Sequence, residues 1–198
     1  VEVNALETLG HLPNVVSIPE EYSDCFNIKI YKTPLKKRQV VRRYIILEYI
    51  NGIELFEYAT SQSKILPQII KYIKQILIII KSIHGKGWAH RDIKLENIMV
   101  DEKDNCHIID LGLAVNVDNP LLQKVYNYTC KNVRGTAQFA APEIVNPDHI
   151  DSTEPFDCRK ADIFAAGVCL YNMLCGKPIT NNRGAEGIGV DANGIEKE

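Results

Sequence analysis

The stretch from His90 to Asn97, with the sequence His-Arg-Asp-Ile-Lys-Leu-Glu-Asn, most constrains what this chain can fold into. A long apolar segment precedes it and a short apolar run, 98–100, follows it, so we expect a loop between a helix and a β-hairpin. Thirteen residues beyond Asn97 comes a second acid, in Asp110-Leu111-Gly112. An acid and an amide that converge with another acid can hold divalent cations on a polyphosphate and orient a hydroxyl group. The pattern therefore predicts phosphoryl-transfer chemistry.

Together with Ala141-Pro142-Glu143, these two motifs resemble the signature set of the protein kinase family. The three segments match the catalytic loop, the magnesium motif and the end of the activation segment, in the family's order and at compatible spacings. The resemblance covers roughly residues 2–178. Lys94, two positions after Asp92, resembles the lysine found at this place in the Ser/Thr branch of the family. The implied fold class is α+β: a truncated two-lobed kinase fold with an incomplete small β-rich lobe and a partial, mainly α-helical large lobe.

The resemblance divides the chain into three parts. Residues 1–50 would form a partial small lobe with the end of a regulatory helix, strands and the hinge. Residues 51–179 would form a partial large lobe that holds the catalytic loop and the activation segment. Residues 180–198 lack an apolar period and are expected to be a disordered tail. No Gly-x-Gly-x-x-Gly occurs, so we expect the glycine-rich loop, the strand lysine and the last helices to lie outside this sequence.

Periodicity and turn residues predict the individual elements. Helices are expected over 1–9, 56–61, 63–83 and 157–174, and strands over 15–18, 26–31 and 43–50. Asn51-Gly52 is expected to be a turn, and 113–140 contains no convincing helix or strand. The helix over 63–83 should bury one apolar face, formed by Ile69, Ile70, Ile73, Ile76, Leu77, Ile80 and Ile83. The helix over 157–174 is expected to be buried, and the resemblance implies that its Asp162 bonds back to the backbone of the catalytic loop.

The resemblance also implies roles for individual residues, with ATP and Mg²⁺ as cofactors. Asp92 would be the catalytic base, Lys94 would neutralise charge on the transferred phosphoryl group, and Asn97 with Asp110 would bind magnesium. The implied nucleotide-binding residues are the gatekeeper Leu47, the hinge residues Glu48 to Ile50, Glu54, Glu96, Met99 and Asp110. Leu111 stands where Phe is commoner and can still pack against His90 and the helix at Leu6. Glu2 takes the position of the helix glutamate, although a solvated residue is the simpler alternative.

The implied partner is a protein substrate with a target Ser or Thr. Glu54 and Glu96 match the acidic pair with which basophilic kinases bind an arginine before the target, because two carboxylates can clamp one guanidinium. Both positions are also common for structural reasons, so the basic preference stays open. Arg91 would bind a phosphate group on the activation segment. Thr129 is the best candidate for the residue that is phosphorylated.

Composition and charge exclude several other classes. A net charge of -2 gives no general attraction to nucleic acid or to an anionic membrane, and Lys36-Lys37-Arg38 is best explained as a solvated loop. The most apolar run, 76–80, is too short to cross a bilayer, and residues 1–10 show no signal peptide. The six cysteines include no Cys-x-x-Cys pair, so reduced thiols in a cytoplasmic protein are expected, with a nuclear location as the alternative. Oligomeric state is not predicted.

Two classes of function remain open from the sequence. The first is a Ser/Thr kinase that transfers the γ-phosphoryl group of Mg-ATP to protein hydroxyls. The second is a catalytically silent kinase-like binding module or a nonfunctional fragment, because the phosphate loop, the strand lysine and the last helices are not in the sequence. The presence of Asp92, Lys94, Asn97 and Asp110 argues against loss of chemistry by substitution.

Overall fold

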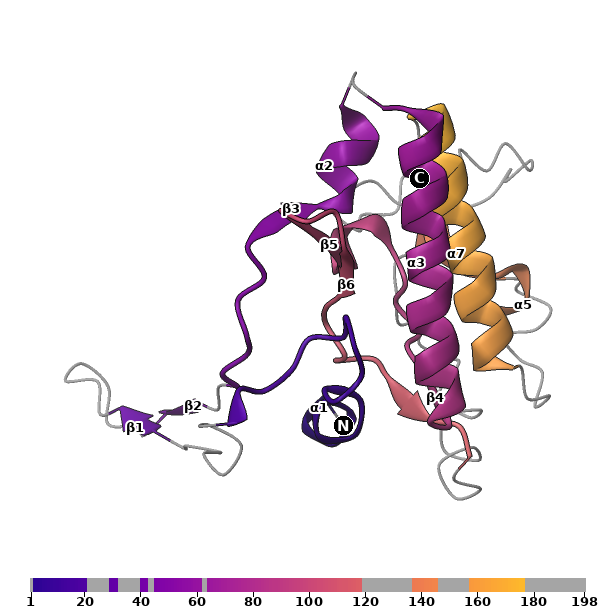
Figure 1. The fold of residues 1–198 in the computed structure, drawn as a ribbon. Helices are drawn as coiled ribbons and strands as arrows, with labels where there is room; N and C mark the ends of the chain where they lie inside the picture. Colours follow the sequence, from indigo (N-terminus) through magenta and orange to yellow (C-terminus); the bar gives the residue numbers. More distant parts are fainter. Residues whose placement is uncertain are drawn as a thin grey trace, which may run out of the picture.

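The computed structural model describes residues 2–20, 29–31, 40–42, 45–61, 64–118, 137–145 and 157–176. The predictions for Lys36-Lys37-Arg38, for Thr129 and for the tail 180–198 lie outside these residues. A pair of long helices stands beside a small antiparallel sheet, and a short N-terminal helix lies at one end of that sheet (Figure 1). One hydrophobic core joins these parts.

The long helices α3 (Leu66–Gly85) and α7 (Cys158–Cys175) run antiparallel, because the end of α3 at His84 meets the first turns of α7 at Asp162. Pro67 fits the first turn of α3, where its missing N–H has no helical partner to lose. The Asp157 side chain caps α7 by accepting the Arg159 N–H at 2.9 Å. Gly176 ends that helix in the left-handed conformation, with φ of 64°.

The buried face of α3 is rotated relative to the prediction. Its buried residues are Ile69, Tyr72, Ile76, Ile79, Ile80 and Ile83. Ile70 and Leu77 are each 40% exposed, because they lie about 100° around the helix from Ile69 and Ile76. The helix also begins at Leu66 rather than at 63, since Ile65 has an extended backbone.

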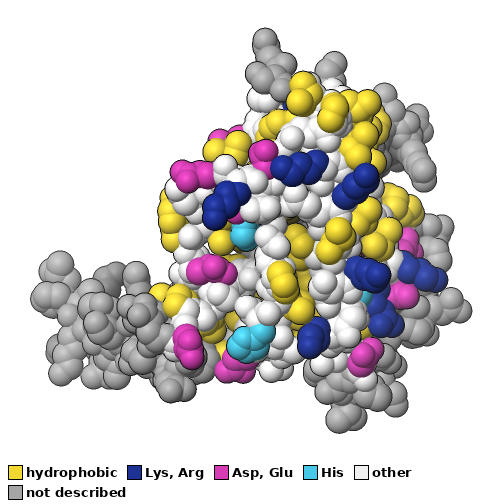
Figure 2. Space-filling model, viewed as in Figure 1, with side chains coloured by type: hydrophobic (Ala, Val, Ile, Leu, Met, Phe, Trp, Pro, Cys, Tyr) yellow, Lys and Arg dark blue, Asp and Glu magenta, His cyan; other side chains and the backbone are white. Residues whose placement is uncertain are grey.

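The α7 helix is buried on one face only, so the prediction of a buried helix was half wrong. Ala161, Ala165, Val168, Cys169 and Met173 are among the residues that pack into the core. The opposite face exposes large hydrophobic side chains, namely Ile163, Phe164, Tyr171 and Leu174. Hydrophobic side chains interspersed with Lys and Arg also gather on the helix-pair side of the molecule in the space-filling view (Figure 2).

The central sheet has the order β3-β5-β6 and is antiparallel throughout. Its strands are β3 (Gly52–Glu54), β5 (Ile98–Asp101) and β6 (Cys106–Ile108). The last two form the hairpin expected after the His90–Asn97 stretch. Asn51-Gly52 leads into a strand instead of a turn, and a Cβ at Gly52 would collide with the Val100 carbonyl of the neighbouring strand. Glycine therefore permits this close pairing.

The remaining elements are short. They are α1 (Glu2–Leu9), β1 (Lys29–Tyr31), β2 (Val40–Arg42), α2 (Leu55–Thr60), β4 (Trp88–Ala89), β7 (Val115–Asn116) and α5 (Pro142–Val145), with 3-10 turns at Leu95–Asn97 and Ala137–Phe139. The β4–β7 pair and the second 3-10 turn correct the prediction that 113–140 has no regular structure. No helix among the described residues is long and apolar enough to cross a membrane.

Two strand predictions, over 43–50 and 15–18, need correction, and the one over 26–31 is confirmed at Lys29–Tyr31. Residues 45–50, within the strand predicted over 43–50, do not pair with any described strand. The strand in this region is Val40–Arg42, just before the predicted one. Only Lys29–Tyr31 is a strand within the predicted 26–31, of which 26–28 lie outside the described residues. Within 15–18 the structure has an isolated parallel bridge from Val15 to Ile108. Hydrogen bonds between neighbouring segments, rather than β-propensity, decide these assignments.

Candidate active site

The catalytic-loop candidate is held between two pieces of sheet. Strand β4 delivers the chain to His90, and the 3-10 turn Leu95–Asn97 passes it on to β5. Ile93 and Leu95 are each 1% exposed and anchor the loop in the core. Ile93 and Leu95 alternate with Asp92, Lys94 and Glu96. The polar side chains therefore lie beside the core rather than in it.

Asp92, Lys94 and Asn97 form one cluster of polar side chains. The Asn97 Nδ2 donates to the Asp92 carboxylate Oδ2 at 2.9 Å and to the Asp92 backbone carbonyl at 2.9 Å. The Lys94 ammonium lies 3.0 Å from the same Oδ2. These contacts hold the carboxylate of Asp92 in one orientation, with a positive charge beside it.

The loop backbone is fastened to helix α7 by Asp162, as predicted. The Asp162 carboxylate is 1% exposed and accepts the His90 N–H and the Arg91 N–H, each at 2.8 Å. Arg91 has φ of 70°, a left-handed conformation that costs a non-glycine residue free energy. Two hydrogen bonds to a buried carboxylate hold this backbone in place immediately before Asp92.

The second acidic motif is tied directly to the first. The Ile109 N–H donates to the Asn97 carbonyl at 2.9 Å, so Asp110 follows a residue bonded to the catalytic-loop candidate. Asp110 has φ of 62°, and its Oδ1 accepts the Gly112 N–H at 3.0 Å. A Cβ at Gly112 would lie 3.8 Å from the Glu2 Oε2. Glu2, the first residue of α1, therefore places its carboxylate beside this turn. Glu2 is thus not simply a solvated terminal residue.

His90 lies underneath both acids. Its side chain is fully buried, and this burial lowers its pKa below the ordinary value, although the carboxylates of Asp162 and Asp92 act in the opposite direction. The Asp92 N–H donates to the His90 Nδ1 at 3.2 Å, so this ring nitrogen carries no hydrogen in the folded protein. Leu111 is also fully buried and belongs to the same core as Leu6, as predicted for the residue that replaces Phe.

The hinge candidate contacts the chain after α1. The Glu48 N–H donates to the Ser17 carbonyl at 3.0 Å, and the Glu48 Oε1 accepts both the N–H and the hydroxyl of Ser17 at 2.8 Å. Leu47 is 37% exposed, and Ile50 is half-buried. Sequence reasoning missed the role of Ser17, because nothing in the local pattern indicates a partner 31 residues away.

Glu54 and Met99 are brought together, and Glu96 lies on the 3-10 turn just before β5. Glu54 and Met99 are directly opposite each other in the β3–β5 register, two residues from Asn97. The Glu96 Oε2 is buried, and no described residue gives it a hydrogen bond. Its charge lies close enough to Cys169 to raise the pKa of that thiol, after the larger effect of burial.

Asn172 lies on α7 one turn beyond Cys169 and was not singled out from the sequence. Its Oδ1 is also buried without a hydrogen-bond donor among the described residues. The side chain is only 8% exposed. Both acceptors are therefore unsatisfied among the described residues.

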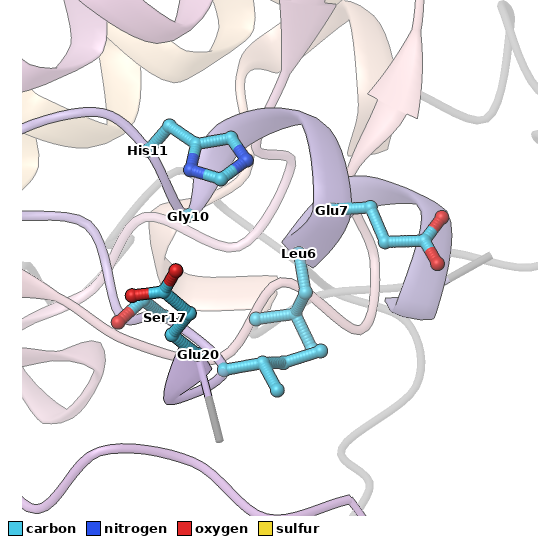
Figure 3. Close-up of a pocket in the computed structure, with 7 residues that line it drawn as sticks. Leu6, Glu7, Gly10, His11, Ser17 and Glu20 are labelled. Atoms are coloured by element: carbon cyan, nitrogen blue, oxygen red, sulfur yellow. The ribbon is translucent and has the colours of Figure 1, made fainter. Parts of the chain in front are cut away.

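A separate cavity lies between the end of α1 and the segment 17–20 (Figure 3). Its volume is about 590 Å³, and it is lined by Leu6, Glu7, Gly10, His11, Ser17, Ile18 and Glu20. None of the predicted active-site residues is among this described lining. Ser17, which lines this cavity, is bonded to Glu48 of the hinge candidate.

The acids and the amide can act on a phosphorylated ligand. Within the described part of the chain, no group of three His, Cys, Asp or Glu side chains could hold a metal ion by itself. Magnesium is usually held by one or two carboxylates together with substrate phosphates, rather than by an all-protein cage. Asp110 with the amide oxygen of Asn97 fits this kind of site, in which the nucleotide would complete the coordination.

Comparisons with known proteins agree with the geometry. The family model described as "Protein kinase domain" matches residues 1–195. A Plasmodium falciparum protein named "Probable serine/threonine-protein kinase 2" is 36% identical over 139 residues, covering 68% of this chain and 24% of the relative. "CBL-interacting protein kinase 10" of Oryza sativa subsp. japonica is 33% identical over 150 residues, or 75% of this chain and 30% of the relative.

A third relative extends the match along the chain. The "Fatty acyl-CoA synthetase and RNA processing-associated kinase 1" of Saccharomyces cerevisiae is 33% identical over 176 residues, which is 88% of this chain and 17% of that protein. The chain therefore spans less than a third of the length of these relatives.

Proposed function

This chain belongs to the protein kinase family, and from that premise we propose that it carries the catalytic centre of a Ser/Thr kinase. The reaction would move the γ-phosphoryl group of ATP to a Ser or Thr hydroxyl of a protein. One observation carries the proposal: the cluster of Asp92, Lys94 and Asn97 is hydrogen-bonded through the Asn97 carbonyl to Ile109, the residue before Asp110.

Each residue of this cluster has a chemical task in the proposal. Asp92 accepts the proton of the substrate hydroxyl or orients that hydroxyl for in-line attack. Lys94 offsets negative charge on the transferred group. Asn97, through its amide oxygen, and Asp110, through its carboxylate, would hold Mg²⁺, which would supply positive charge that stabilises the transferred phosphoryl group.

The nucleotide would lie between the hinge and the sheet. In this proposal the backbone groups of Glu48 and Ile50 bond the adenine, and Leu47 limits the depth of the site. Glu54 meets the ribose, and Met99 packs against the ring. The bonds from Glu48 to Ser17 support this proposal, because they fix the hinge backbone before any nucleotide arrives.

Transfer of radiolabelled γ-phosphate tests the proposal directly. The protein is incubated with Mg-ATP and a general protein substrate, and binding of Mg-ATP is measured in parallel. We expect transfer to Ser or Thr in the wild type and a rate at least about a hundredfold lower with an Asp92→Asn variant that still binds nucleotide. Transfer to tyrosine alone would contradict the assignment to Ser and Thr.

The second candidate function is a kinase-like module that binds a partner without catalysis. Nucleotide binding without phosphoryl transfer would favour this module over the enzyme. Absence of both would mean that this stretch of chain has neither function by itself.

We also propose a preference for substrates with an arginine before the target residue. The buried, unpartnered Oε2 of Glu96 and Oδ1 of Asn172 would accept hydrogen bonds from a guanidinium, and Glu54 adds a second carboxylate on the neighbouring strand. A peptide array should show selection for upstream Arg that weakens in Glu96→Gln. The matched control is Glu57→Gln on the exposed face of α2. An array without selection for Arg would remove this preference.

A further inference from the structure

A lysine lies at the point where two helices end. The Lys64 Nζ donates to the carbonyl of Ala59, in the last turn of α2, at 2.7 Å. A Cβ at Gly176, the residue that follows α7, would collide with the same ammonium group, so Lys64 also lies against the end of α7. Both helices finish at the same end of the molecule, and they pack against each other (Figure 1).

The two helix ends provide the negative charge that an ammonium group needs. Unpaired carbonyl groups give the last turn of a helix a partial negative charge. The Thr60 and Ser61 hydroxyls donate to earlier carbonyls of α2, and Lys64 bonds the carbonyl of Ala59. No ion pair between described residues involves Lys64. Within the described part of the chain, carbonyl groups rather than an acid therefore offset its charge.

The end of α7 that meets Lys64 also carries Asn172. The Gly176 N–H donates to the Asn172 carbonyl at 2.8 Å, and the Oδ1 of Asn172 is a buried acceptor of the proposed arginine site. On its other side, α2 packs against the 3-10 turn Leu95–Asn97, which carries Glu96. Lys64 therefore joins the helix that bears one acceptor to the helix that packs against the turn of the other.

We propose that Lys64 is a positioning residue for the arginine site: its ammonium group joins the ends of α2 and α7 and thereby fixes Asn172 relative to Glu96. This inference rests on the proposed preference for arginine, which gives these two acceptors their task. The described hydrogen bond of Lys64 reaches neither of them. A helix of 6 residues is marginal by itself, so α2 depends on contacts with its neighbours. Without the ammonium group, the end of α2 can move away from α7.

A double-mutant cycle in urea unfolding tests the contact between Lys64 and Gly176. Gly176 has φ of 64°, so Gly176→Ala strains the backbone in any background. In the wild type the added Cβ also displaces the ammonium group, whereas Lys64→Ala has no such group to displace. We therefore expect Gly176→Ala to lower the urea midpoint more in the wild type than in Lys64→Ala. Gly167→Ala, whose Cβ would meet nothing within 4 Å, should shift the midpoint equally in both backgrounds.

NMR tests the position of Asn172 without any need for catalysis. The signal of its side-chain amide should shift in Lys64→Ala and return towards the wild-type position in Lys64→Arg, which restores a positive charge and a donor. The matched control is Lys74→Ala, which removes an exposed lysine from α3 and should leave the signal unchanged.

Peptide phosphorylation tests the consequence for specificity. Two peptides differ only in having Arg or Ala before the target Ser, and the ratio of their kcat/KM values measures the selection for arginine. Lys64→Ala should lower this ratio roughly two- to thirtyfold, the range for residues that modulate a site without touching it, while the KM for ATP stays unchanged. Lys74→Ala should keep the wild-type ratio.

Three results would overturn the proposal. The first is an equal midpoint shift for Gly176→Ala in both backgrounds, and the second is an Asn172 signal that does not move in Lys64→Ala. The third is an unchanged ratio in Lys64→Ala when the wild type does select arginine. A wild type without this selection would remove the proposed preference, whereas the unfolding and NMR results would still decide whether Lys64 positions Asn172.

Discussion

Asn97 donates from a single amide nitrogen to two oxygens of Asp92, the carboxylate Oδ2 and the backbone carbonyl, both at 2.9 Å. The nitrogen of that amide therefore faces into the loop, and its oxygen is the atom suited to a cation. One short turn thus joins the carboxylate that we propose as proton acceptor to the amide oxygen that we propose as a magnesium ligand. The Asn97 carbonyl extends the same link to Ile109, one residue before Asp110.

Replacing Asp92 by Asn should lower turnover by roughly a hundredfold to ten-thousandfold, the usual size of a general-base contribution. The amide cannot accept the substrate proton, and it removes the ion pair with Lys94. Steady-state phosphoryl transfer in the full protein measures the effect. Asp104→Asn is the control, because this exposed turn residue can still accept the bond from the Tyr72 hydroxyl. Equal rates in wild type and Asp92→Asn would contradict the role of Asp92.

Replacing Asp110 by Ala should remove the magnesium dependence of nucleotide binding. Its carboxylate is the charged ligand in the proposed metal site, so affinity for Mg-ATP should fall by at least about tenfold. Binding of ATP without magnesium should change little. Calorimetric titrations with and without Mg²⁺ measure the affinities for Mg-ATP and for ATP alone. Asp118→Ala serves as the control, because Asp118 is exposed. A magnesium effect of wild-type size in Asp110→Ala would assign the metal to other residues.

Ile80→Ala should lower the free energy of unfolding by roughly 2–5 kcal/mol, because it leaves a cavity beside fully buried neighbours. Ile80 is 0% exposed, whereas Ile78 on the same helix is 63% exposed. Ile78→Ala should therefore stay within about 0.5 kcal/mol of the wild type. Denaturant unfolding measures both variants. Similar losses for the two would mean that the outer face of α3 is also packed.

The free energy of unfolding should fall as the pH drops below 6.5, the ordinary value for histidine. His90 is buried with a lowered pKa, so the unfolded chain takes up a proton there that the folded chain does not. Its contribution is present above pH 6.5 and is lost as the pH falls towards the lowered value. Unfolding curves measured across this range should be flatter for His90→Phe than for the wild type. The exposed His11→Phe serves as control, and identical slopes in all three proteins would refute the assignment.

The sequence predicted the elements that depend on local pattern. The His90–Asn97 loop, the hairpin after it, and the helices α1, α2, α3 and α7 all occur, with ends that differ by a few residues. The bond from Asp162 to the loop backbone was also confirmed. The family motifs were sufficient to predict these features. The residues of the loop and hairpin are close in sequence, and Asp162 has the partner that the resemblance implies.

Predictions failed where a neighbouring segment decides the conformation. Gly52 looked like a turn residue, but the β5 strand pairs with it. Residues 45–50 looked like a strand, yet Glu48 bonds to Ser17 outside any ladder. Ile70 and Leu77 fitted the helical period of the core and are exposed, because the packing of α7 and the sheet selects a different face. The periodicity of a sequence does not say where the neighbouring segment will pack.

By itself, the sequence determined which chemical groups this protein can present: two acids, an amide and a lysine at short, fixed separations along the chain. The tertiary structure decided how they are held. Asp162, far from Asp92 in sequence, meets the loop backbone because the helix that carries it packs into the shared core. Local separations follow from covalent geometry, whereas contacts between distant residues follow only from the way in which the apolar faces are buried together.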